Sequence, residues 1–151
     1  MRTPALLLAL AIAGFAQTSA AENSAAAPDT AGLPDGLYAE FVTPHGSLVA
    51  ELHYRQTPMT VASFVGRAEG SLAPRDGQPF FTGLRWYRVV PGFVIQSGDP
   101  VRSAKPPGAT LTDEEDAAGH PLSFPDEIAP GLHHAGAGYL SMANGGPDTN
   151  S

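Results

Sequence analysis

Residues 86–99 read Trp-Tyr-Arg-Val-Val-Pro-Gly-Phe-Val-Ile-Gln-Ser-Gly-Asp, which predicts two short strands joined by a Pro-Gly turn. Side chains alternate between the faces of a strand, so Arg88 and Val90 share one face, and Val94 and Gln96 share a face of the next strand. A guanidinium and an amide among apolar neighbours are costly to bury unless something hydrogen-bonds them. A bound ligand would supply that partner. The alternative is a structural arginine paired with a carboxylate of the chain.

A second stretch, residues 140–151, reads Leu-Ser-Met-Ala-Asn-Gly-Gly-Pro-Asp-Thr-Asn-Ser. The two stretches resemble the two signatures of the cyclophilin-type peptidyl-prolyl cis-trans isomerases. Those signatures typically read Phe-His-Arg-Val-Ile-Pro-Gly-Phe-Met-Ile-Gln-Gly-Gly-Asp and Leu-Ser-Met-Ala-Asn-Ala-Gly-Pro-Asn-Thr-Asn-Gly. Two long motifs in the right order make a specific signal, and the chain resembles an exported, bacterial-type member of that family.

The resemblance implies a mainly β fold, a closed antiparallel β-barrel of eight strands with two capping helices. Because the chain ends inside the second signature, we expect the C-terminal strands and the second helix to be missing from it. The isomerase domain is expected at residues 37–151, incomplete at its C-terminus. The residue pattern predicts the opening hairpin of such a domain, with strands at residues 38–43 and 47–54 around a turn at residues 44–46.

Residues 57–70 carry the clearest helix signal. Thr57 is a preferred N-cap residue, Pro58 suits the first helical position, and Gly70 is typical of the residue after the last turn. One apolar stripe at helical spacing is formed by Val61, Phe64, Val65 and Ala68. We expect this stripe to cover the open end of the barrel.

The resemblance also implies which residues act on the substrate. Arg88 matches the catalytic arginine, whose guanidinium hydrogen-bonds the prolyl nitrogen when the amide is twisted. Phe93 and Val94 match the floor of the proline pocket, and valine is a smaller, stiffer substitute for the family's methionine. Without the resemblance, a phenylalanine after Pro-Gly is usually a core residue.

Three further residues match substrate-binding positions of the family. Gln96 matches the glutamine that hydrogen-bonds the substrate backbone and orients the arginine. Ala143 and Asn144 match the pair whose backbone holds the peptide in an extended pose. From the residues alone, Asn144 is equally a turn residue before two glycines.

Isomerisation of an X-Pro bond needs no nucleophile, metal or general base, so no cofactor is expected. His133 and His134 lie near Asp126 and Glu127 in the sequence, but their spacing fits no standard set of metal ligands and the chain has no cysteine. Ser141 lies in no Gly-x-Ser-x-Gly motif, which argues against a hydrolase.

Residues 1–21 have the pattern of a secretion signal, with an arginine near the start and an uncharged apolar run at residues 5–15. That run is too short to span a bilayer comfortably, so we expect cleavage after Ala20 or Ala21 rather than anchoring. Residues 22–36 are rich in small residues and proline without apolar periodicity, which predicts a flexible linker.

The charge balance bears on partners. The net charge is -7 and Lys105 is the single lysine, which argues against nucleic acid and, after signal cleavage, against a membrane surface. The partners that the resemblance implies are proline-containing unfolded or extended polypeptides and cyclosporin-like ligands.

One departure from the family lies between Asp99 and Phe124, where the family usually has a short glycine-rich loop. This chain has a longer segment that contains the acidic run Asp113–Asp116. Such a run is most often a solvated surface. Since the equivalent loop of the family borders the substrate pocket, the alternative is an acidic wall that favours basic peptides.

The leading hypothesis is therefore a periplasmic or secreted prolyl isomerase that assists the folding of exported proteins. Rotation about an X-Pro amide is slow enough to limit folding, so an enzyme that accelerates it speeds the folding of proline-containing proteins. Two alternatives stay open. One is a peptide-binding or chaperone module without turnover, and the other is an inactive fragment of the isomerase.

Overall fold

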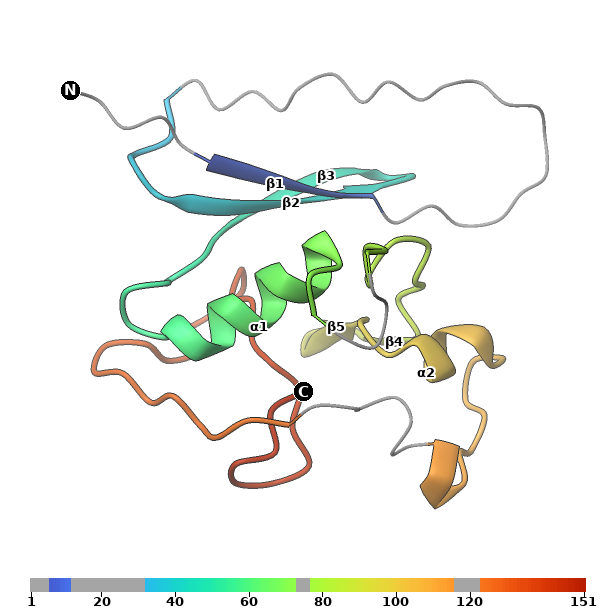
Figure 1. The fold of residues 1–151 in the computed structure, drawn as a ribbon. Helices are drawn as coiled ribbons and strands as arrows, with labels where there is room; N and C mark the ends of the chain where they lie inside the picture. The colour runs from blue at the N-terminus through green and yellow to red at the C-terminus, as the bar shows by residue number, and fades with distance from the viewer. Residues whose placement is uncertain (1–5, 12–31, 73–76, 116–122) are drawn as a thin grey trace.

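The computed structural model describes residues 6–11, 32–72, 77–115 and 123–151 (Figure 1). In this part of the chain, no helix has the length and apolar character needed to cross a membrane. The elements in chain order are β1 (Leu6–Ala11), β2 (Leu37–Thr43), β3 (Gly46–Glu51), α1 (Pro58–Glu69), β4 (Arg88–Val90), β5 (Val94–Gln96) and α2 (Pro100–Ala104).

The first sheet contains the hairpin that the sequence predicts. β2 and β3 pair antiparallel, and Thr43 lies opposite Gly46 across a two-residue turn. β1 pairs parallel with β2 on its other edge, giving the order β1-β2-β3. β1 falls inside the predicted secretion signal. The rest of that signal and most of the predicted linker lie outside the described residues, and cleavage stays a prediction.

α1 begins and ends where its sequence predicts, at Pro58 and before Gly70. Gly70 has a φ of 76°, and a Cβ at this position would lie 2.6 Å from the carbonyl of Gln78, so only glycine fits. The predicted cap by Thr57 is wrong in its chemistry. The Thr57 hydroxyl donates back to the carbonyl of His53 at 3.1 Å and does not cap the helix N–H groups.

The core lies between the first sheet and α1, which Figure 1 shows beneath that sheet. The predicted stripe of α1 faces it, with Val65 half-buried and the other three members buried. Phe64 stands in its middle, 6.0 Å from the ring centre of Phe41 on β2 and 5.2 Å from that of Phe81. The buried cluster consists of Ala39, Phe41, Leu52, Val61, Phe64 and Ala68.

The described residues do not form the expected closed barrel. They form a three-stranded sheet and a separate two-stranded sheet, so the architecture is mainly β with a few helices. β4 and β5 have three residues each and pair only with one another. Residues 123–151 make a single isolated bridge, from Phe124 to Asn150. Prolines and glycines recur through this segment and remove the donors and regular backbone that a longer strand needs.

The N-terminus of α1 is capped from far along the chain. Glu127 accepts hydrogen bonds from the backbone N–H groups of Met59 at 3.0 Å and Thr60 at 2.6 Å. Burial alone would raise the pKa of Glu127, but these two donors hold it below its usual value. A carboxylate is well placed here because the first N–H groups of a helix lack partners within the helix. The contact ties residues 123–151 to α1.

Replacing Glu127 by glutamine is expected to lower the free energy of unfolding at neutral pH by about 1 kcal/mol, since the helix loses a charged acceptor. A carboxyl whose pKa is lowered by folding stabilises the protein fully above its unfolded-state pKa, and this contribution is lost as the pH falls through the lowered value. Urea denaturation at a series of pH values should show the difference between the two proteins shrinking toward acid pH. Glu114→Gln, at an exposed carboxylate, is the control. If the difference in free energy of unfolding between the two proteins is the same at every pH, this role of the carboxylate is contradicted.

Candidate functional site

The β4–β5 hairpin places Arg88 directly opposite Gln96, and Val90 opposite Val94. The turn between the strands is closed by the Phe93 N–H donating to the Val90 carbonyl at 3.1 Å. Gly92 has a φ of 72°, and proline followed by such a glycine is typical of a type II turn. The predicted shared face therefore exists, and the order of residues along the hairpin sets which side chains meet.

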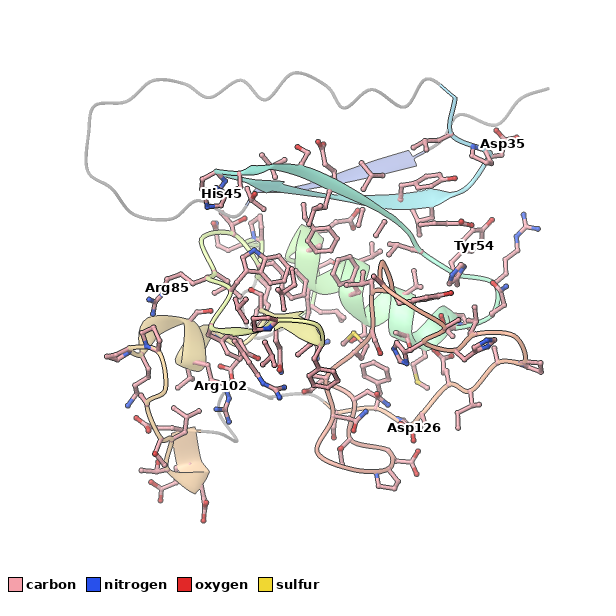
Figure 2. The ribbon with its side chains drawn as sticks, turned by 180° about the vertical axis from the view of Figure 1, so that it is seen from behind. Asp35, His45, Tyr54, Arg85, Arg102 and Asp126 are labelled. Carbon is pink, nitrogen blue, oxygen red and sulfur yellow. The ribbon has the colours of Figure 1, made fainter. Side chains whose placement is uncertain are left out.

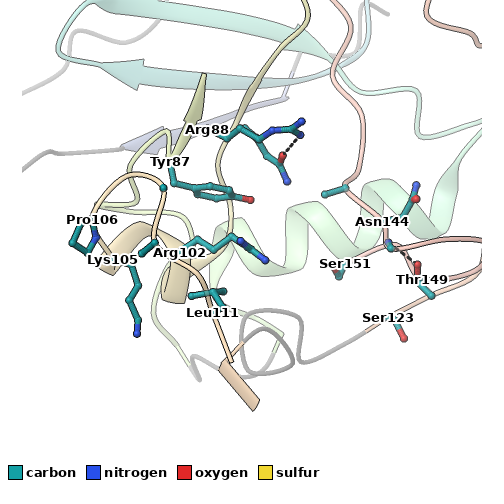
Figure 3. A pocket seen from close by; sticks show the side chains of 15 residues that line it. Tyr87, Arg88, Arg102, Lys105, Pro106, Leu111, Ser123, Asn144, Thr149 and Ser151 are labelled. Atoms are coloured by element: carbon teal, nitrogen blue, oxygen red, sulfur yellow. Dashed lines mark hydrogen bonds between the residues drawn. The ribbon is translucent and has the colours of Figure 1, made fainter. Parts of the chain in front are cut away.

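Arg88 and Gln96 contact each other through their side chains. Arg88 Nη1 donates to Gln96 Oε1 at 3.1 Å (Figure 3). This partner is a neutral amide, so it orients the guanidinium without neutralising its charge. The structural alternative, an arginine paired with a carboxylate, is not what the described side chains around Arg88 form.

A cavity of about 750 Å³ opens beside this pair. Four of the six residues predicted for the site line it: Arg88, Gln96, Ala143 and Asn144. They come from two stretches far apart in the sequence, and Figure 3 shows Asn144 across the cavity from Arg88. The two signatures that the sequence suggested would act together do meet at one cavity.

Phe93 and Val94 do not line this cavity, contrary to the expectation that they form its floor. Phe93 also differs from a core residue, because 75% of its surface is exposed. It sits at the tip of the hairpin turn, where its ring lies 5.7 Å from Arg88 Cζ in a cation–π contact. Val94 is half-buried on the hairpin face that carries Arg88 and Gln96.

The loop that carries Ala143 is held by its own backbone and by the buried side chain of Asn150. Ser151 N–H donates to the Ala143 carbonyl at 3.2 Å. Asn150 exchanges two backbone hydrogen bonds with Phe124, at 3.0 and 3.2 Å, and its Nδ2 donates to Asp126 Oδ1 at 2.7 Å. These contacts hold the second signature against residues 123–127.

Tyr87 is a cavity residue that the sequence did not reveal. Strict alternation of side chains along a strand would place Tyr87 on the opposite face from Arg88. Because β4 begins only at Arg88, Tyr87 lies outside the strand and this alternation does not apply to it. Burial raises the pKa of its phenol, with a smaller contribution from Asp99. The available signal was the signature itself, where the family has histidine and this chain has tyrosine.

Of the acidic run, the three described residues Asp113, Glu114 and Glu115 do not line the cavity. From the long segment after Asp99, the lining comes instead from Arg102, Lys105, Pro106, Gly108, Ala109 and Leu111. Glu115 lies in a helical turn, where its side chain accepts from Thr112 N at 3.1 Å while Glu115 N donates to Thr112 Oγ1 at 3.2 Å. Lys105 Nζ lies 2.5 Å from Glu115 Oε1 and lowers the pKa of that carboxyl. Asp116 lies outside the described residues.

His133 and His134 are not part of a metal site among the described residues. His134 packs edge-on against Tyr139, with ring centres 6.1 Å apart. Across the described ranges, no three histidine, cysteine or carboxylate side chains come together in a group that would hold a metal ion.

Comparison with known proteins agrees with the two signatures. Residues 38–151 match the family model for cyclophilin type peptidyl-prolyl cis-trans isomerase/CLD. A peptidyl-prolyl cis-trans isomerase-like 1 protein of Aspergillus fumigatus is 37% identical over 110 residues, which are 73% of this chain and 58% of that protein. A peptidyl-prolyl cis-trans isomerase of Schizosaccharomyces pombe is 37% identical over 112 residues, 74% of this chain and 61% of that protein.

The human peptidyl-prolyl cis-trans isomerase-like 1 is 35% identical over 126 residues, 83% of this chain and 64% of the human protein. This chain thus spans about three fifths of the length of the curated relatives that it matches. The matched region contains both signatures and all the cavity residues described above.

Proposed function

Because the chain belongs to the cyclophilin-type peptidyl-prolyl cis-trans isomerase family, we propose that it accelerates rotation of X-Pro amide bonds, with Arg88 as the catalytic residue. The observation that carries this proposal is the Arg88–Gln96 contact at the edge of a cavity shared with Ala143 and Asn144. A charged donor held by an amide faces space large enough for a peptide segment.

The chemistry follows from the amide itself. Rotation about the C–N bond has a barrier of about 18–20 kcal/mol because it breaks the resonance of the amide. In the twisted state the prolyl nitrogen becomes pyramidal and gains a lone pair. The Arg88 guanidinium then donates to that lone pair, an interaction that neither planar isomer offers, and so lowers the barrier without a covalent step.

The other site residues hold the substrate. Gln96 accepts from Arg88 and uses its amide N–H groups on the peptide backbone. The backbone of Ala143 and Asn144 holds the peptide extended on the opposite side. Phe93, exposed beside Arg88, and Val94 supply apolar contacts at the hairpin end of the site, where the proline ring would pack.

The proposed partners are proline-containing unfolded or extended polypeptides, with cyclosporin-like cyclic peptides as ligands of the same cavity. The secretion-signal pattern of residues 1–21 supports a role in the folding of exported proteins, in the periplasm or outside the cell.

The direct test is to measure cis/trans exchange of a short X-Pro peptide by NMR exchange spectroscopy, with and without the protein. Uncatalysed exchange takes tens of seconds or longer, so catalysed exchange within seconds would be unmistakable. Binding of the peptide without faster exchange would instead identify a non-catalytic peptide-binding module. Absence of both would contradict the proposed function.

A further inference from the structure

Tyr87, Arg102 and Lys105 line the end of the cavity that lies opposite Asn144 in Figure 3. We propose that this end, called here the basic subsite, binds the carboxylate side chain of an aspartate or glutamate close to the proline of the substrate. The inference rests on the proposed function, since the same polypeptide would lie across Arg88. It reverses the preference for basic peptides that an acidic wall would produce.

The charged side chains that line the cavity are of one sign. They are those of Arg88, Arg102 and Lys105, and no aspartate or glutamate is among its described lining residues, although Glu115, outside that lining, pairs with Lys105 Nζ at 2.5 Å. This is unusual for a chain with a net charge of -7. A local cluster of cations in a cleft concentrates the field there and attracts an anionic group.

Arg102 forms an ion pair with Asp99, and of these two residues only Arg102 lines the cavity. Arg102 Nε lies 3.2 Å from Asp99 Oδ2, and the Arg102 side chain keeps 37% of its surface exposed whereas that of Asp99 keeps 1%. The carboxylate is buried behind α2, where it also accepts from the Arg102 backbone N–H at 2.9 Å. Asp99 therefore fixes the position of Arg102 while the guanidinium lies at the cavity wall (Figure 3).

Lys105 is held in place through its backbone and through the ion pair of its ammonium with Glu115. Arg85 reaches the C-terminal end of α2, where Nε donates to the Ser103 carbonyl and Nη2 to the Lys105 carbonyl, both at 2.6 Å. Figure 2 shows Arg85 beside α2, and the Ser103 hydroxyl donates back to the Arg85 carbonyl at 3.2 Å. Because these contacts fix the chain at residues 103–105, a ligand does not have to order it on binding.

Tyr87 completes the basic subsite between the cations. Its half-buried ring gives an apolar surface for the methylene groups of an acidic side chain, and its phenol is a donor. Burial raises the pKa of this phenol, so the hydroxyl keeps its proton at neutral pH. A substrate carboxylate would thus meet the Arg102 guanidinium, the neutral Tyr87 donor and, in competition with Glu115, the Lys105 ammonium.

The test uses proline peptides that carry glutamate, glutamine or lysine singly at each of the three positions on either side of the proline. Dissociation constants come from NMR titration at low salt, and exchange rates are measured on the same samples. At one position or more, we expect the glutamate peptide to bind about fivefold more tightly than its glutamine counterpart, the size of a well-placed surface ion pair, and the lysine peptide to bind more weakly. Added salt should reduce the difference in affinity between the glutamate and glutamine peptides, because it screens the charges.

Variants locate the effect. In Arg102→Gln and in Lys105→Gln, the ratio of glutamine-peptide to glutamate-peptide dissociation constants should fall toward one. The matched control is Arg55→Gln, which removes the same charge from an exposed arginine outside the cavity lining. Arg55 hydrogen-bonds Tyr54, which Figure 2 shows far from Arg102. This control should keep the full ratio. Lys105→Gln changes a partly exposed side chain whose partner is the partly exposed Glu115, so it remains informative if Arg102→Gln does not fold.

The outcomes separate this proposal from the proposed function. Equal binding of glutamate and glutamine peptides at every position, or tighter binding of lysine peptides, would overturn the basic subsite even if all peptides isomerise faster. A glutamate preference that survives in both variants would overturn its location. Failure of every peptide to isomerise faster, with the glutamate preference intact, would overturn the proposed function alone.

Discussion

Replacing Arg88 by alanine is expected to lower kcat/KM for X-Pro isomerisation by about 10²–10³-fold, the effect of removing one fixed donor from a transition state that accumulates charge. Arg88 is exposed and its neutral partner Gln96 also reaches solvent, so the free energy of unfolding should change little. Most of the loss should appear in kcat, because the hydrogen bond to the prolyl nitrogen forms only as the amide twists. NMR exchange spectroscopy over a range of peptide concentrations separates the two constants.

Two further variants sharpen this test. Arg88→Lys keeps the charge but replaces a planar fork of donors by a mobile ammonium, and should remain strongly impaired. Arg55→Ala removes an arginine outside the cavity and should isomerise peptides at the wild-type rate. A normal kcat in Arg88→Ala would remove Arg88 from the catalytic role, whatever the protein's affinity for peptides.

Replacing Phe64 by alanine is expected to lower the free energy of unfolding by about 3–5 kcal/mol. Phe64 is buried at the centre of the contact between α1 and β2, with aromatic rings on two sides. Its loss removes apolar burial and leaves a cavity that the surrounding backbone cannot close. Native domains have about 5–15 kcal/mol of stability in total, so this change alone should leave a marginal fold. Urea denaturation followed by circular dichroism measures it.

Phe93→Ala is the matched control, because it makes the same chemical change at a ring that is 75% exposed. Its effect on the free energy of unfolding should stay within about 0.5 kcal/mol, as for other surface substitutions. If Phe64→Ala destabilises the protein no more than Phe93→Ala does, the core does not lie between α1 and the first sheet.

The elements that could be predicted from the sequence are those whose signals are local. Pro58 fixes its own φ at a value that suits the first helical turn, and Gly70 readily adopts the left-handed conformation that ends a helix, so the bounds of α1 follow from residue type. The Pro91–Gly92 turn sets the register that places Arg88 opposite Gln96, and side-chain alternation does the rest. The match to two long signatures then brought Ala143 and Asn144 to the same site, which no local pattern would have done.

Only the tertiary structure decided which other side chains reach that site and how α1 is capped. Glu127 lies 67 positions from Thr60, and no spacing rule connects a helix N-terminus to a carboxylate so distant. The acidic run was the visible feature of the long segment, yet Arg102 and Lys105 face the cavity because Asp99 and Arg85 fix α2 against it. Side-chain direction in a loop depends on the partners that hold its backbone. Those partners come from elsewhere in the chain, so composition along the segment does not show which charge it presents.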